Sequence, residues 1–186
     1  MHLPAAYDCI TITVDGRGSA FQGDAFMFAM YKAIGHTERV DQTDFVRWFS
    51  TSGPYANVVD KSRISVFGWS YGGFTTTHII GYGGNGDPVF TSGVAVAPVG
   101  DWRFYDALYA ERYMDYQGVE NELLQPHWVN QSMIQRPLLE NNMTYFEQAQ
   151  YSIIHGTNDD NVHFMHSTQM QKTLTRLGID FDSSVC

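Results

Sequence analysis

Apolar and polar positions along the chain predict strands that alternate with helices. Four short runs rich in Val and Ile predict strands, over residues 7–14, 63–67, 92–97 and 151–154. Apolar residues at helical spacing predict helices over 25–34, 38–50, 74–80, 101–114 and a last segment that follows residue 160. This alternation indicates the α/β class, with a mostly parallel sheet and helices on both faces.

Glycines and capping residues mark the expected helix ends. Gly35 and Gly178 are expected to end the first and last helices, because glycine adopts a left-handed conformation without strain. Asp160 or Asn161 is expected to cap the last helix at its start. The stretch 115–150 is polar and interrupted by prolines, so no regular element is predicted there.

Composition indicates one globular domain and argues against some partners. The chain has 186 residues, 15% of them aromatic and 17% charged, and is long enough for a sizeable core. Its formal net charge of −9 argues against nucleic acid and anionic membranes as partners. No run of about 18 apolar residues predicts a membrane span, and no signal-peptide pattern opens the chain. Cys9 and Cys186 make no disulfide framework, and Cys9 is expected to be buried in its strand.

The strongest chemical signal is Gly-Trp-Ser-Tyr-Gly-Gly at 68–73, between a predicted strand and a predicted helix. This context indicates a nucleophile elbow, in which Ser70 lies on a strained turn. Side chains at Gly68 and Gly72 are expected to collide with the neighbouring strand and helix. The alternative is an ordinary glycine-rich turn with an unreactive hydroxyl. Because ligands of parallel sheets bind beyond the carboxyl ends of the strands, Asp15, 98–102 and Asp159 are expected near Ser70.

Four motifs occur in a fixed order along the chain. They are Asp-Gly-Arg-Gly at 15–18, Gln-Gly-Asp at 22–24, the elbow at 68–73 and His-Gly-Thr-Asn-Asp-Asp-Asn-Val-His-Phe at 155–164. Together they resemble the prolyl oligopeptidase family, in its dipeptidyl peptidase IV and fibroblast-activation-protein branch. The resemblance covers nearly the whole chain. It implies an α/β-hydrolase fold and a serine peptidase, without cofactor or metal, that removes N-terminal dipeptides with proline or alanine second.

The same resemblance implies roles for individual residues. Ser70 would be the nucleophile, and Asp159 the acid that orients a histidine. The backbone N–H of Tyr71 would donate to the oxyanion. Asn161 would bind the substrate backbone carbonyl, with a turn or cap role as the alternative. The pocket for the proline ring would be lined by Tyr71, Val99, Trp102, Tyr105, Tyr109 and Val162. By spacing alone, 102, 105 and 109 share one helix face, which is more often core than pocket.

The remaining histidines are expected to be structural. His163 and His166 stand three apart, as metal ligands can, but no third ligand accompanies them. His78 is expected to be buried and hydrogen-bonded. His155 matches a family position with a backbone role.

The chain also departs from the family pattern. The family's catalytic histidine lies in a loop well beyond the acid, and no histidine follows His166. The tail 183–186 differs from the family sequence, and Ser92 stands where many members place a disulfide cysteine. The family's β-propeller, which grips the substrate amine, has no counterpart. We therefore expect residues 1–186 to be a partial catalytic domain that is inactive by itself.

Three functions are compatible with these observations. The first is a serine dipeptidyl peptidase by parentage, and the retained Ser70 and Asp159 favour it. The second is an inactive pseudoenzyme or binding module with the same fold, and the third is an esterase, against which the pocket aromatics argue. The resemblance implies a peptide substrate, homodimers among full-length relatives, and a plasma-membrane or extracellular location. Glycosylation patterns at Asn130 and Asn142 agree with that location, with chance as the alternative.

Overall fold

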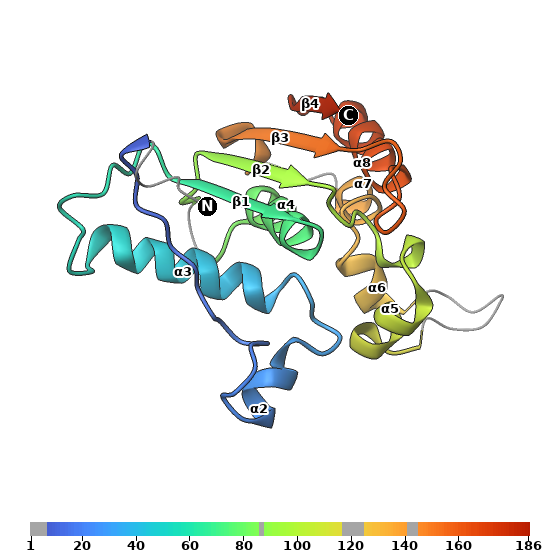
Figure 1. Ribbon diagram of the computed structural model, residues 1–186, viewed down its shortest axis with the longest axis horizontal. Coiled ribbons are helices and arrows are strands. Elements are labelled where there is room, and N and C mark those ends of the chain that lie inside the picture. Colours follow the sequence, from blue (N-terminus) through green and yellow to red (C-terminus); the bar gives the residue numbers. More distant parts are fainter. Residues whose placement is uncertain (1–6, 86–87, 117–124, 141–144) are drawn as a thin grey trace.

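The computed structural model describes residues 7–85, 88–116, 125–140 and 145–186. In chain order the elements are α2 (Asp24–Met27), η1 (Phe28–Met30), α3 (Thr37–Thr51), β1 (Ser65–Trp69), α4 (Tyr71–Tyr82), β2 (Ser92–Val96), η2 (Trp102–Phe104), α5 (Ala107–Met114), α6 (Pro126–Asn130), α7 (Arg136–Glu140), η3 (Phe146–Gln148), β3 (Gln150–His155), α8 (Met165–Arg176) and β4 (Asp182–Val185). Figure 1 shows the four strands side by side.

The strands form one parallel sheet in the order β1-β2-β3-β4. Trp69 at the end of β1 pairs with Val96 at the end of β2, and Val96 pairs with Ile154 of β3. The carboxyl ends of these three strands therefore meet at one edge of the sheet, where parallel sheets bind ligands. The predicted α/β class is confirmed.

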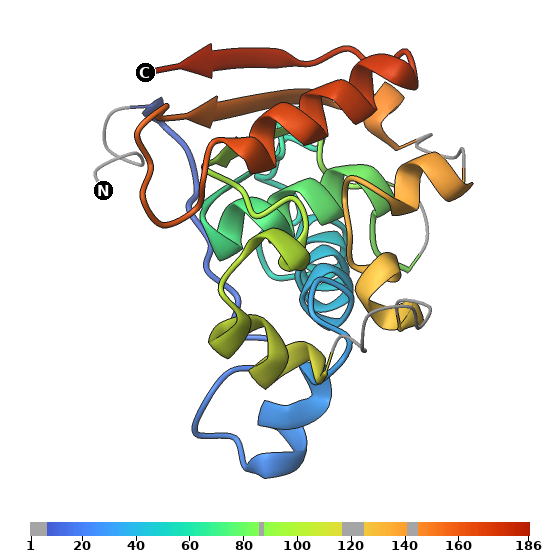
Figure 2. The ribbon, with the colours of Figure 1, turned by 90° about the vertical axis from the view of Figure 1, so that its right-hand side faces the viewer.

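One face of the sheet carries the core. Figures 1 and 2 show α4 and α8 on the same side of the strands, and their buried apolar residues pack against alternate strand residues. This core comprises Ile79, Ile80, Ala95, Tyr151, Ile153, Met170 and Leu174, with neighbours from the connecting segments. On the opposite face Phe67 is 46% exposed and Trp69 64% exposed. No helix of the described residues is long and apolar enough to cross a membrane.

The strand predicted over 7–14 does not form. This segment has no regular structure, and Ile10, Ile12 and Cys9 are exposed. A β-branched run becomes a strand only where a neighbouring strand accepts its backbone hydrogen bonds, and this run has no ladder to one in the described part of the chain. The expected burial of Cys9 is wrong for the same reason.

Two predicted helices are broken by competing hydrogen bonds. The run 25–34 yields only α2 and η1, because the backbone N–H of Lys32 donates to Tyr113 O at 2.8 Å instead of continuing the helix. The predicted helix end at Gly35 is wrong, because η1 already ends at Met30, although Gly35 does have a left-handed φ of 81°. The run 101–114 is divided into η2 and α5, because the Asp106 side chain accepts the N–H of Tyr109 and starts a new helix.

Short elements occupy parts of the chain where none was predicted. Between 115 and 150 the described residues form α6, α7 and η3, each of five residues or fewer and too short for a periodic pattern. The last helix, α8, has Phe164 as its N-cap residue without a side-chain cap, so the predicted caps at 160 and 161 are wrong. Gly178 follows it at φ 71°, as expected, and the tail forms β4, parallel to β3.

The end of β1 and the first turn of α4 lie in close contact. A Cβ atom on Gly68 would lie 2.4 Å from the carbonyl carbon of Gly72. A Cβ atom on Gly73 would lie 3.0 Å from Val96 O. By contrast, a Cβ atom on Gly72 would have nothing within 4 Å among the described residues. The predicted collision is therefore confirmed at Gly68 and wrong at Gly72, whose backbone is what Gly68 meets.

We expect Gly68→Ala to lower the free energy of unfolding by about 1–3 kcal/mol, because the new methyl group must push β1 and α4 apart. Gly72→Ala, in the same motif but with open space, should change it by less than about 1 kcal/mol. Urea unfolding followed by far-UV circular dichroism measures both values. Equal losses in the two variants would contradict the close contact.

Candidate active site

Ser70 lies on the strained turn between β1 and α4. Its backbone has φ 55° and ψ −119°, a conformation that costs a residue with a side chain about 1–3 kcal/mol. The Ser70 N–H donates to Val96 O at 2.9 Å, and the N–H of Phe74 donates to Ser70 O at 3.0 Å. These bonds, from the neighbouring strand and the following helix, hold the turn. The half-buried Ser70 side chain forms no hydrogen bond to a histidine in the described residues.

Asp159 lies in the turn that follows β3. Its Oδ1 accepts hydrogen bonds from the backbone N–H groups of Asn161 and Val162, both at 3.0 Å. The other carboxylate oxygen, Oδ2, lies 3.5 Å from Nε2 of the buried His155. That ring is 2.7 Å from Val162 O through Nε2 and 2.7 Å from Ser167 Oγ through Nδ1. His155 therefore supports the Asp159 turn through Nε2 and joins it to α8 through Nδ1.

The six residues predicted to line a proline pocket belong to one apolar cluster. Val99, Trp102 and Val162 are buried within it, and Tyr71, Tyr105 and Tyr109 pack against them. The indole of Trp102 stacks on the ring of Tyr109, with centroids 5.5 Å apart and planes at 16°. These residues come from α4, the segment after β2, α5 and the turn after β3. The predicted single helix face is wrong, because η2 and α5 are separate.

Asn161 is fixed beside this aromatic cluster. The Tyr105 hydroxyl donates to Asn161 Oδ1 at 2.7 Å, across 56 residues of sequence. With its oxygen occupied, the exposed Asn161 side chain presents its Nδ2 donor to solvent.

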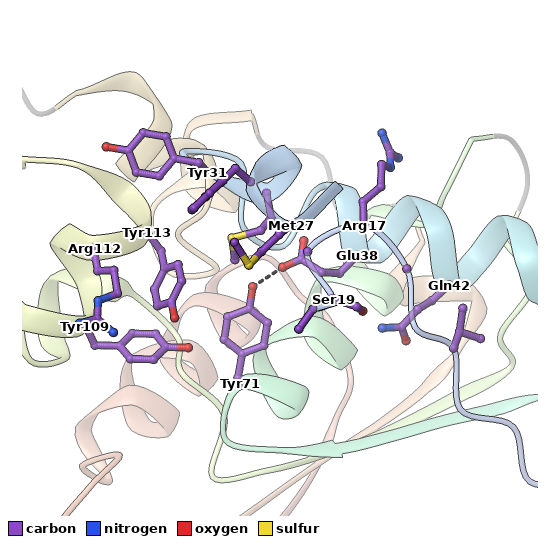
Figure 3. A pocket seen from close by; sticks show the side chains of 16 residues that line it. Arg17, Ser19, Met27, Tyr31, Glu38, Gln42, Tyr71, Tyr109, Arg112 and Tyr113 are labelled. Atoms are coloured by element: carbon purple, nitrogen blue, oxygen red, sulfur yellow. Dashed lines mark hydrogen bonds between the residues drawn. The ribbon is translucent and has the colours of Figure 1, made fainter. Parts of the chain in front are cut away.

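A cavity of about 500 Å³ opens beside the Tyr71 ring, on the side away from Trp102 and Phe74. Figure 3 shows the Tyr71 hydroxyl directed at Glu38, with Met27, Tyr109 and Tyr113 around the space. The Tyr71 hydroxyl donates to Glu38 Oε1. Sequence reasoning missed Glu38, because 33 residues separate it from Tyr71 and no local pattern joins them.

The Asp-Gly-Arg-Gly motif at 15–18 is bound to helix α3 through Arg17. Arg17 forms a two-pronged ion pair with Asp41 of α3, through Nη2 at 2.6 Å and Nε at 3.0 Å, and this lowers the pKa of the Asp41 carboxyl. Asp15 is exposed, and no hydrogen bond joins it to Ser70 in the described ranges. The motif thus fixes the irregular segment to α3 near the cavity.

Two buried histidines are neutral. Burial lowers the pKa of His78 to about 3 and that of His166 to about 4. His78 Nε2 lies 3.2 Å from Gln131 O, which confirms the expected buried and bonded ring. His166 Nδ1 accepts the N–H of Gly100 at 3.1 Å. The His166 ring is buried, whereas His163, three residues earlier, is exposed. Within the described ranges, no group of three His, Cys, Asp or Glu residues could hold a metal ion.

Comparison with known proteins identifies the family. The family model "Prolyl oligopeptidase family" matches residues 1–186. The chain belongs to the prolyl oligopeptidase family. The chain is 41% identical over 182 residues to dipeptidyl peptidase 4 of Sus scrofa, covering 98% of this chain. It is 37% identical over 182 residues, again 98% of this chain, to prolyl endopeptidase FAP of Mus musculus.

A solved structure agrees with the family assignment. Dipeptidyl peptidase 4 of Porphyromonas gingivalis matches 92% of this chain and 22% of its own, with a TM-score of 0.76 and 32% identity. The chain likewise spans 22% of the length of the two curated relatives. The family is one of serine peptidases, and the four-stranded sheet corresponds to part of its α/β-hydrolase fold.

The pKa of His166 predicts a pH dependence of stability. The folded pKa, about 4, lies below the ordinary value of 6.5, so below pH 6.5 the unfolded chain takes up a proton that the folded chain excludes. The stabilisation is fully present above pH 6.5 and is lost as the pH falls toward 4, by up to about 3 kcal/mol. Urea unfolding at a series of pH values measures this decrease.

His166→Asn should make that decrease smaller, because its amide oxygen can still accept the Gly100 N–H but takes up no proton, while the buried His78 still contributes to the fall. The matched control is His163→Asn at the exposed neighbouring histidine, which should keep the wild-type curve. A His166→Asn curve parallel to wild type between pH 6.5 and 4 would refute the neutral buried ring.

Proposed function

We propose that these residues are part of a serine dipeptidyl peptidase that cleaves after a proline or alanine in the second position. The observation that carries this proposal is the strained Ser70 turn lying beside the aromatic cluster. A serine on a strained turn at the carboxyl end of a parallel strand has its hydroxyl placed where a substrate carbonyl can be attacked, as acyl transfer requires. The names of the relatives support the same class of reaction.

In the proposed mechanism Ser70 Oγ attacks the scissile carbonyl and transfers its proton to a histidine. Asp159 orients that histidine and stabilises its positive charge, and the Tyr71 N–H donates to the oxyanion. As the intermediate collapses, the histidine gives its proton to the leaving amine and the shortened peptide is released; water, deprotonated by the same histidine, then hydrolyses the acyl-enzyme and frees the dipeptide and Ser70. Of the six histidines in the described residues, five have ring nitrogens within hydrogen-bond distance of other groups, namely His36, His78, His127, His155 and His166, and no hydrogen bond joins the sixth, His163, to Ser70. We infer that the base is contributed by residues outside this sequence.

The substrate class follows from the chemistry of the cluster. A proline ring is compact and apolar and has no N–H, so it suits a wall of aromatic faces without polar anchors. Tyr71, Tyr105 and Tyr109 supply such faces at the exposed side of the buried Trp102. The Asn161 amide, oriented by Tyr105, would donate to the substrate backbone carbonyl.

The wider biology is proposed on the relatives alone. We infer that residues 1–186 form part of a catalytic domain whose complete protein is a homodimer at the plasma membrane or outside the cell. Asn130 is exposed at the end of α6 and would be available for a glycan. Asn142, the second predicted acceptor, lies outside the described residues.

A second candidate is a binding module that retains the hydrolase fold without activity. The observation that favours it is the Ser70 hydroxyl, which has no histidine bonded to it in the described part of the chain. An unactivated serine hydroxyl is a weak nucleophile.

A chimera separates these candidates. The chain would replace the matching segment of dipeptidyl peptidase 4 of Sus scrofa, and release of p-nitroaniline from Gly-Pro-p-nitroanilide would be measured. We expect the chimera to be active and Ser70→Ala within it to lower kcat by about 10³-fold or more. The 186-residue chain alone should show neither release nor labelling by a fluorophosphonate, because it lacks the base. A folded but silent chimera would favour the binding module, and labelling of the isolated chain that Ser70→Ala abolishes would refute the missing base.

The pocket assignment predicts a change in specificity. In the active chimera, Tyr105→Ala should lower kcat/KM for Gly-Pro substrates about tenfold more than for Gly-Ala substrates, because a ring loses more contact area than a methyl group. Tyr105→Phe is the matched control: it keeps the ring but releases Asn161, so both substrates should lose equally. Equal losses with Tyr105→Ala would remove Tyr105 from the pocket.

A further inference from the structure

Tyr71 places its backbone N–H and its aromatic ring beside the proposed reaction centre. Its N–H is the proposed oxyanion donor, and its ring contacts Trp102 at 5.7 Å and Phe74 at 5.5 Å between centroids. The ring thus forms one wall of the aromatic cluster. On its other side lies the cavity of about 500 Å³, so packing alone leaves the ring room to turn away.

The Glu38 carboxylate is held in place by hydrogen bonds other than the one it forms with Tyr71. Its Oε2 accepts hydrogen bonds from the Gly35 N–H and the Thr37 hydroxyl, each at 3.0 Å. The remaining oxygen, Oε1, accepts the Tyr71 hydroxyl. A carboxylate fixed by two donors at the start of α3 binds the third donor in a single direction.

The start of α3 is itself fixed against α4. Gly35, at φ 81°, lies so close to Phe74 that a Cβ atom would stand 2.6 Å from the ring. Phe74 in turn contacts Trp102, with centroids 5.2 Å apart. The carboxylate and the aromatic cluster therefore share one rigid support.

Burial, followed by the charge of Glu38, raises the pKa of the Tyr71 hydroxyl well above its ordinary value of 10. The phenol accordingly remains a donor throughout the working pH range. A bond between a phenol and a carboxylate is stronger than one between neutral groups.

We propose that Glu38 is a positioning residue, which holds the Tyr71 ring against Trp102 and thereby sets the preference for a five-membered ring at the second substrate position. The inference rests on the proposed function for the identity of the ligand, and on the observed contacts for the position of the ring. Without Glu38 the ring turns toward the cavity, and the wall that a proline ring would contact is lost. An open-chain substituent, which follows a changed surface more easily, loses less.

The test uses ligand binding to the full 186-residue chain, which requires no catalytic base. NMR titration would compare glycyl-pyrrolidide with the open-chain glycyl-diethylamide, in wild type, Glu38→Ala, Tyr71→Phe and the double variant. We expect each single variant to bind the pyrrolidide about tenfold more weakly and the diethylamide less than about threefold more weakly. Because both changes remove one bond, the double variant should bind no more weakly than the singles.

The unliganded chain supplies an independent measurement. Ring flips of Tyr71, followed by aromatic ¹³C NMR, should be slow in wild type and fast in Glu38→Ala. If Glu38→Ala does not fold, Glu38→Gln replaces it: this variant keeps the side-chain shape and one acceptor oxygen but loses the charge, so Tyr71 should flip faster than in wild type. The matched control is Glu147→Ala at an exposed glutamate of η3, which should resemble wild type in every measurement.

Each outcome decides a different claim. Additive losses in the double variant, equal losses for the two ligands, or unchanged ring flips in Glu38→Ala would overturn the positioning role. If wild type binds neither ligand, the proposed pocket and the specificity claim are overturned, and the ring-flip rates alone decide whether Glu38 positions Tyr71.

Discussion

The carboxyl edge of the sheet depends on the close approach of β1 and α4 at Gly68. With no side chain there, the backbone of Gly72 lies where a Cβ atom would stand, and the first turn of α4 can begin directly after the strand. That turn puts Ser70 in its strained conformation and fixes the direction of Tyr71. Because Gly73 also packs against the end of β2, where a Cβ atom would lie 3.0 Å from Val96 O, the same turn also sets the position of the segment that carries Val99 and Trp102.

The two apolar clusters have different tasks. The larger one lies between the sheet and the helices α4 and α8, and it supplies most of the hydrophobic stabilisation. The smaller one lies beyond the strand ends and combines buried members with tyrosines that are partly exposed. Phe74 and Tyr71, three positions apart on α4, belong to the second cluster, whereas Ile79 and Ile80, one turn further, belong to the first. A single helix therefore connects the stable core to the candidate site.

The parts that sequence could predict are those encoded by local motifs. The elbow at Ser70 was found as a short pattern beside a strand, whereas Asp159 and the aromatic residues after β2 were assigned through the family resemblance. The strand expected over 7–14 failed because strand formation depends on a partner, which no pattern within the run records. The Glu38 contact was missed for a related reason, since its partner lies on another helix far along the chain. The division of 101–114 into η2 and α5 was not predicted, because the role of Asp106 as the cap of α5 became clear only from the structure.

Tyr71 places two proposed roles in one residue but in separable atoms. The ring is encoded by the side chain, while the N–H belongs to the main chain and is present in every amino acid except proline. Substitutions at this position can therefore reshape the wall of the pocket while the donor stays where the elbow puts it. In evolutionary terms, the breadth of accepted substrates can drift at position 71 without loss of the oxyanion donor, and only a mutation to proline would remove both together.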